Sequence, residues 1–93
     1  MYSMSQHITI IISGKVQGVF YRAATKEKAD ELGVKGFVRN EPSGNVYIEA
    51  EAPEEILYKF VKWCNSGPAR AQVQHVEVIP GDSKSFANFA IQR

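Results

Sequence analysis

The sequence predicts an α+β domain in which two helices cover one face of an antiparallel sheet. Segments with strand and helix periodicity follow one another in the order strand, helix, strand, strand, helix, strand, with room for a short fifth strand at the C-terminus. This order is that of a split β-α-β sandwich, the ferredoxin-like arrangement. Hydrophobic residues make up 44% of the chain, enough for one core, and no linker or repeat divides residues 1–93.

The first strand is expected at His7–Ser13, where β-branched residues are dense. Because Ile11 interrupts the polar alternation on its second face, we expect a central strand buried on both sides. Helical periodicity then runs from Tyr21 to Leu32, and Gly33 is well placed to end this helix in a left-handed conformation. The predicted inner face of the helix consists of Tyr21, Ala24, Lys28, Ala29 and Leu32.

Two further strands are expected at Lys35–Asn40 and Asn45–Glu51, separated by four residues that include a proline and a glycine. A connection this short with these residues indicates a hairpin. In the second strand, apolar residues alternate with Tyr47, Glu49 and Glu51. We therefore expect one covered face of the sheet and one face that is wetter.

A second helix is expected to begin at Pro53, because proline and the two acids after it favour a first helical turn. Gly67 and Pro68 are expected to stop it. A fourth strand is expected within Val73–Ile79 and a shorter one within Phe86–Ile91. The apolar stripe of the second helix consists of Ile56, Leu57, Phe60, Val61 and Cys64.

The charge and cysteine content exclude several classes of protein. The chain carries 11 basic and 10 acidic residues with mixed signs, so it lacks the clustered basic excess of a nucleic-acid binder. Cys64 is the only cysteine, which rules out an intramolecular disulfide and favours a reducing compartment. Met1–His7 does not resemble a signal peptide, and no apolar run approaches the roughly 20 residues that span a bilayer. We expect a cytoplasmic protein without nucleic-acid or membrane partners.

The segment Gly14–Arg22 joins the first strand to the first helix and has the composition of an anion-binding loop. Backbone N–H groups at a helix N-terminus are unpaired, and glycines can turn several more of them inward. Arg22 lies in the first helical turn, where a cation is unfavourable unless it faces an anion. Its planar guanidinium suits two phosphate oxygens at once. A plain surface loop remains the alternative, because glycine-rich turns alone are a weak signal.

Asn40 is the second candidate residue, at the end of a predicted strand just before the hairpin. Taken alone, an asparagine at this position is most simply a turn-forming residue. The functional alternative is a carboxamide that hydrogen-bonds a water molecule without ionising. Both interpretations stay open at this point.

Together the two segments resemble the acylphosphatase family. The first fits the signature Gly-x-Val-Gln-Gly-Val-x-(Phe/Tyr)-Arg, and residues 36–46 fit the second, Gly-aromatic-small-basic-Asn, three residues, Gly-x-Val. The resemblance implies hydrolysis of a small-molecule acyl phosphate, with inorganic phosphate as product and competitive inhibitor. It implies that Asn40 positions the attacking water and that Arg22 holds the phosphate together with loop N–H groups. Those N–H groups belong to Lys15, Val16, Gln17, Gly18, Val19 and Phe20.

The chemistry that the signatures lack is also informative. None of their specified positions holds a Ser, Cys, His or Asp that could act as nucleophile, and no cluster has metal-ligand spacing. Phosphoryl transfer can be catalysed mainly by positioning and charge stabilisation. We therefore expect direct attack by water on the phosphoryl group of the substrate, with no metal, no cofactor and no phospho-enzyme. We also expect the enzyme to be a monomer.

Two positions depart from the family pattern. Ala52 stands where the second signature ends in a glycine, and a positive φ there would strain alanine. Phe20 stands where many relatives carry glycine or another small residue, and it is expected to narrow the mouth of the loop. His7, His75 and Cys64 lie outside both signatures, so we expect structural roles for them.

Two other functions fit the same scaffold. A single-stranded RNA-binding module would stack bases on aromatic residues of the central strands. The first strand holds isoleucines there, and Tyr47 has glutamates beside it. A regulatory domain could bind an acyl or carbamoyl phosphate without hydrolysing it. The presence of both Arg22 and Asn40 favours the enzyme.

Overall fold

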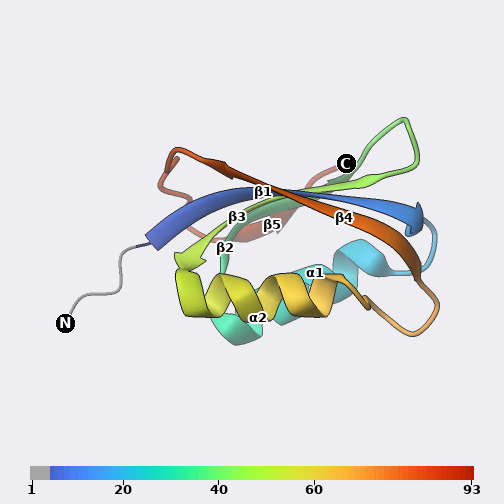
Figure 1. The fold of residues 1–93 in the computed structure, drawn as a ribbon, viewed down its shortest axis with the longest axis horizontal. Helices are drawn as coiled ribbons and strands as arrows, with labels where there is room; N and C mark the ends of the chain where they lie inside the picture. The colour runs from blue at the N-terminus through green and yellow to red at the C-terminus, as the bar shows by residue number, and fades with distance from the viewer. Residues whose placement is uncertain (1–4) are drawn as a thin grey trace.

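The computed structural model describes residues 5–93 and shows two helices packed on one face of a five-stranded sheet (Figure 1). The elements follow the predicted order, so the ferredoxin-like α+β fold is confirmed. Met1–Met4, part of the polar N-terminal segment considered above, lie outside the described residues. The strands are β1 (Ser5–Lys15), β2 (Lys35–Asn40), β3 (Val46–Pro53), β4 (Gln72–Gly81) and β5 (Phe89–Ile91), and the helices are α1 (Tyr21–Leu32) and α2 (Glu54–Cys64).

The sheet has the strand order β4-β1-β3-β2-β5 and is antiparallel except at one edge. β1 pairs with β3 and β4, and β2 pairs with β3, all antiparallel, whereas β5 pairs with β2 in parallel. The predicted antiparallel sheet is therefore confirmed for β1 to β4, whereas the possible fifth strand is present as β5 and pairs in parallel. β4 and β5 lie on opposite edges, and the chain crosses the sheet and turns back between them. As a result β5 is antiparallel in direction to β4 and parallel to β2.

β1 is the central strand that the sequence predicted, between β3 and β4. Ile8, Ile10 and Ile12 share one face of it and belong to the core beneath the helices. On the other face Ile11 is only half-buried, so the prediction of full burial on both sides holds for one side.

The helices pack on this face through one side of each. α1 differs from the prediction, because Thr25 is fully buried whereas Lys28 is half-buried and pairs with Glu31 at 3.1 Å. Burial of Thr25 is tolerated because its hydroxyl donates to the carbonyl oxygen of Tyr21 at 2.7 Å. α2 buries part of its predicted stripe completely, at Leu57, Phe60 and Cys64.

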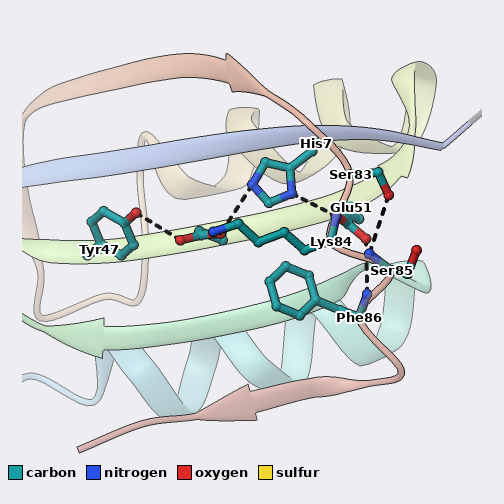
Figure 2. Close-up of polar contacts among 8 residues, drawn as sticks. His7, Tyr47, Glu51, Ser83, Lys84, Ser85 and Phe86 are labelled. Carbon is teal, nitrogen blue, oxygen red and sulfur yellow. Dashed lines mark hydrogen bonds and ion pairs between the residues drawn. The ribbon is translucent and has the colours of Figure 1, made fainter.

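Part of the opposite face of the sheet, at Glu51, is covered by residues 82–88, which join β4 to β5 (Figure 2). Glu49 and Glu51 of β3 are each only 5% exposed, so the prediction of a wetter face is wrong for both. The main-chain N–H groups of Lys84 and Phe86 donate to Glu51 at 2.6 and 3.1 Å and hold the covering segment in place. An RNA-binding module would need this face open to stack bases.

His7 lies between the two buried glutamates, and Figure 2 shows its contact with Glu51. Its Nδ1 lies 2.7 Å from Glu51 Oε2 and its Nε2 lies 3.2 Å from Glu49 Oε1. Glu49 also accepts hydrogen bonds from the Lys84 ammonium at 2.8 Å and from the Tyr47 hydroxyl at 2.9 Å. Buried carboxylates are costly unless paired and hydrogen-bonded, and both carboxylates meet that requirement here. The structural role expected for His7 thus has identified partners.

The hydrogen bonds to Glu51 make the stability of the fold sensitive to acid. Burial raises the pKa of Glu51, but the N–H of Lys84, the His7 ring and the N–H of Phe86 more than offset it, so its pKa lies below the ordinary value of 4.5. Such a group contributes stability that is complete above its unfolded pKa and is lost as the pH falls through the folded value. We expect the free energy of unfolding, measured with urea, to fall below about pH 4.5, and less steeply in Glu51→Gln.

Glu55→Gln is the matched control, since Glu55 is exposed on α2 and outside this network. It should keep the pH dependence of the wild type. If Glu51→Gln loses stability with acid as steeply as the wild type does, the Glu51 contacts do not stabilise the fold.

Candidate active site

A pocket of about 310 Å³ lies where the loop after β1 and the start of α1 meet the ends of β2 and β5. Arg22 and Asn40, on which the sequence analysis placed the chemistry, both line it. The lining residues are Val16, Gly18, Phe20, Tyr21, Arg22, Ala23, Asn40 and Ile91. Three other predicted loop residues do not line the pocket, namely Lys15, Gln17 and Val19.

The loop leaves β1 at a bulge and enters α1 through left-handed residues. At Gly14 φ is 122°, and a Cβ atom there would overlap the main-chain oxygen of Gln72 on β4. This position therefore requires glycine. Gly18, with φ of 73°, and Phe20, with φ of 63°, then turn the chain into α1.

The main chain of the loop is suited to an anion. Val16 and Val19 are 1% and 5% exposed, so they anchor the loop on the core. None of the loop and turn hydrogen bonds within residues 5–93 uses an N–H group of residues 16–20. α1 has no acidic residue in its first turn, whereas α2 has Glu54 and Glu55 there. An anion from outside the chain would supply the negative charge that the N-terminus of α1 lacks.

Arg22 is positioned by the C-terminal segment. Its Nη1 donates to the main-chain oxygen of Gln92, just after β5, at 3.2 Å. The contact uses one of the five N–H donors of the guanidinium, and the others can face a ligand. Arg22 is the one charged side chain among the residues lining the pocket. An anion bound there would meet this cation and the loop together.

Asn40 is the last residue of β2, and its side chain contains a hydrogen-bond acceptor that is not satisfied by residues 5–93. Its Oδ1 is buried and has no hydrogen-bond partner among the residues that the structure describes. The hairpin is closed without its side chain, by Glu41 N to Asn45 O at 2.8 Å and Gly44 N to Glu41 O at 3.0 Å. A buried acceptor without a partner is costly, so such groups are uncommon and call for an explanation. A water molecule bound in the pocket would satisfy it.

Gln17 connects the loop to this hairpin, which the sequence analysis missed. Its Nε2 donates to the main-chain oxygens of Glu41 and Asn45, at 2.8 and 2.9 Å. These residues flank the turn that follows Asn40. The Gln17 side chain therefore fixes the distance between the anion-binding loop and the end of β2. The only signal for this role in the sequence is the carboxamide of Gln17, which has two N–H donors and lies between Val16 and Val19.

Other reactive groups lie away from the pocket. Burial in α2 raises the pKa of the Cys64 thiol to about 12, so the thiol stays protonated at neutral pH. His75 is exposed on the edge strand β4. Among residues 5–93, no group of three or more His, Cys, Asp or Glu side chains could hold a metal ion. No helix in the described part of the chain has the length and hydropathy to cross a membrane.

Comparisons with known proteins agree with this geometry. The family model described as acylphosphatase matches residues 8–91. The chain belongs to the acylphosphatase family. It is 37% identical over 89 residues to an acylphosphatase of Nocardioides sp., a match that covers 96% of this chain and 90% of the relative.

Solved acylphosphatase structures share the whole fold. The structure from Coxiella burnetii matches with a TM-score of 0.92 at 30% identity, covering 96% of this chain and 94% of that protein. The structure from Bacillus subtilis matches with a TM-score of 0.91 at 32% identity, covering 95% and 99%. The likeness therefore extends over nearly the whole chain.

The two departures from the acylphosphatase pattern have different consequences. Ala52 is buried in β3 and has no positive φ, so the strain expected at that position is absent. Phe20 instead has the left-handed backbone, and its side chain is 72% exposed at the pocket. The strained position is therefore in the loop beside the pocket.

Proposed function

We propose that this acylphosphatase acts by direct attack of water on a phosphoryl group held by Arg22 and the main chain of residues 15–20. Acylphosphatases are hydrolases acting on acid anhydrides. They split the carboxyl–phosphate bond of an acyl phosphate into a carboxylate and inorganic phosphate. In this proposal the substrate is a small-molecule acyl phosphate, and inorganic phosphate is both product and competitive inhibitor.

Arg22 would hold two phosphoryl oxygens with its planar fork, while the loop N–H groups bind the remaining charge. The main-chain oxygen of Gln92 limits the freedom of the guanidinium before substrate arrives. Donors that are fixed in advance stabilise charge in the transition state without reorganising, and this is often the largest contribution to catalysis. The loop and Arg22 would thus bind the substrate and lower the barrier.

The Asn40 side chain lines the same pocket as Arg22, and its buried Oδ1 has no partner among residues 5–93; this is the observation that carries the proposal. This oxygen would accept a hydrogen bond from the attacking water and direct a lone pair of that water at phosphorus. A carboxamide does not ionise, so it adds no negative charge beside the phosphate. The turn-forming alternative for Asn40 gains no support, because the hairpin closes without its side chain.

Water is the proposed nucleophile because the lining holds no better one. It contains no Ser, Cys, His, Asp or Glu, and the Tyr21 hydroxyl is engaged with the Cys64 main-chain oxygen at 2.6 Å. Burial also raises the pKa of Tyr21. The water oxygen bonds to phosphorus, the bond from phosphorus to the acyl oxygen breaks, and its electron pair leaves on the carboxylate. The protons of the water pass to the phosphate and the solvent.

The remaining parts of the proposal concern the setting of the enzyme. We propose a monomer that works in the cytoplasm, a reducing compartment in which a single free cysteine such as Cys64 is ordinary. The reaction as written requires neither a metal nor a cofactor, because the carboxylate is a good leaving group without further activation.

The test is phosphate release from benzoyl phosphate or acetyl phosphate by the purified chain in the presence of a chelator. We expect rapid turnover that chelator concentration does not change. Binding of phosphate without turnover would instead indicate the regulatory domain, and turnover that stops with the chelator would contradict the metal-free reaction.

A further inference from the structure

Three apolar residues that line the active-site pocket are open to solvent. Phe20 is 72% exposed and Ile91 is 42% exposed, and Ala23 is also exposed. All three line the pocket that Arg22 and Asn40 line. They come from the loop, α1 and β5, and we call them the apolar rim.

The backbone of Phe20 makes its exposure more notable. Its φ of 63° and ψ of 22° are left-handed, a conformation that glycine adopts freely and an aromatic residue does not. Its side chain also gains little from the core, since most of its surface faces solvent. Phe20 thus gains stability neither from its backbone conformation nor from packing in the core. Because it lies next to the ligand site, we infer that its ring makes a contact that forms only when the ligand is bound.

The charges at the pocket limit what that ligand contact is. Arg22 is the one charged side chain in the lining and is assigned to the phosphate. Lys26, on the next turn of α1, is paired with Asp30 at 2.9 Å and donates to the Phe89 main-chain oxygen at 3.1 Å. A substrate with a second anionic group would therefore find no cation in the lining for it. An uncharged, apolar acyl group would find the rim.

We propose that the apolar rim binds the acyl portion of the substrate and makes this enzyme prefer aromatic and larger alkyl acyl phosphates to acetyl phosphate. The inference rests on the phosphate being held as described under Proposed function. With the phosphoryl group at the loop, the acyl group extends from phosphorus away from the attacking water, because attack and departure lie roughly in line. Contact between an aromatic acyl group and the Phe20 ring adds to the area that both bury.

The experiment measures kcat/KM for benzoyl phosphate and for acetyl phosphate and takes their ratio. A ratio cancels losses of folded protein and changes in the loop that affect both substrates. We expect the ratio to fall about threefold to tenfold in Phe20→Ala and Phe20→Gly, and to recover largely in Phe20→Leu. Phe20→Gly also removes the strained φ, so agreement between it and Phe20→Ala assigns the effect to the ring. Ile91→Ala tests the second member of the rim and should shift the ratio in the same direction.

Tyr58→Ala is the matched control, because Tyr58 is an aromatic residue 70% exposed on α2 and does not line this pocket. It should keep the wild-type ratio. An unchanged ratio in Phe20→Ala and Ile91→Ala would overturn the proposal. A wild-type dimer that Phe20→Ala converts to monomer would also overturn it, since a second copy of the chain would then cover the rim. The role of Arg22 is tested separately, by loss of activity on both substrates in Arg22→Ala.

Discussion

Replacing Arg22 by alanine is expected to lower kcat/KM for acyl phosphates by at least about 10³-fold and to abolish competitive inhibition by inorganic phosphate. Removal of one preorganised donor commonly costs about 10²–10³ in rate, and removal of a charged arginine from a phosphoryl group costs about 10³–10⁵. Arg22 is also the one cation in the pocket lining, so no neighbouring side chain can substitute for it. Steady-state hydrolysis of benzoyl phosphate with and without inorganic phosphate measures both effects.

Two variants control for charge and for folding. Arg22→Lys keeps the charge without the planar fork and should recover only part of the activity. Arg70→Ala removes an exposed arginine outside the pocket and should behave like the wild type. Thermal unfolding of Arg22→Ala should stay near that of the wild type, since the one hydrogen bond that the Arg22 side chain makes within residues 5–93 is exposed. Unchanged inhibition by phosphate in Arg22→Ala would contradict its assignment as the phosphate clamp.

Replacing Asn40 by alanine is expected to lower kcat by about 10²-fold or more while inorganic phosphate still inhibits at wild-type concentrations. The water loses its acceptor, and misplacement of a reacting group by about 1 Å can cost this much. The phosphate clamp should be untouched, because within residues 5–93 no hydrogen bond of Arg22 or of the loop uses the Asn40 side chain. Comparing kcat with the inhibition constant of phosphate separates these two outcomes.

Stability provides a second measurement on the same variant. The Asn40→Ala change removes an oxygen that makes no hydrogen bond to another group within residues 5–93, so the free energy of unfolding should change little. A residue that only formed the turn would give the opposite pattern, with lost stability and retained activity. Asn45→Ala, at the other end of the hairpin, is the control, because Asn45 contributes its main-chain oxygen to the Gln17 contact.

The features that the sequence predicted well are those that a single segment determines. The helix from Tyr21 to Leu32 was predicted with the bounds that the structure shows, and Gly33 ends it in the left-handed conformation expected. Local periodicity and glycine positions suffice for such features. Placing Arg22 and Asn40 in one pocket required more, because they lie 18 residues apart on different elements. The family signatures supplied that link.

What the sequence could not predict depends on contacts between distant segments. The burial of Glu49 follows from a connection more than 30 residues later, which brings Lys84 over the sheet. Alternation of polar residues along β3 could only suggest a wet face. The parallel pairing of β5 likewise depends on how residues 82–88 cross the sheet, a path with no local pattern. Thr25 was missed because its hydroxyl is satisfied within the helix itself.

The Gln17 contact also bears on how the chain can change. A hairpin turn such as residues 41–45 is usually where insertions and sequence drift are tolerated, because little else depends on its shape. Here both main-chain oxygens that Gln17 binds lie in that turn. Lengthening it would move these acceptors and release the loop from the strand that carries Asn40. The turn is therefore as constrained as a core position, and tags or inserted domains belong elsewhere on the surface.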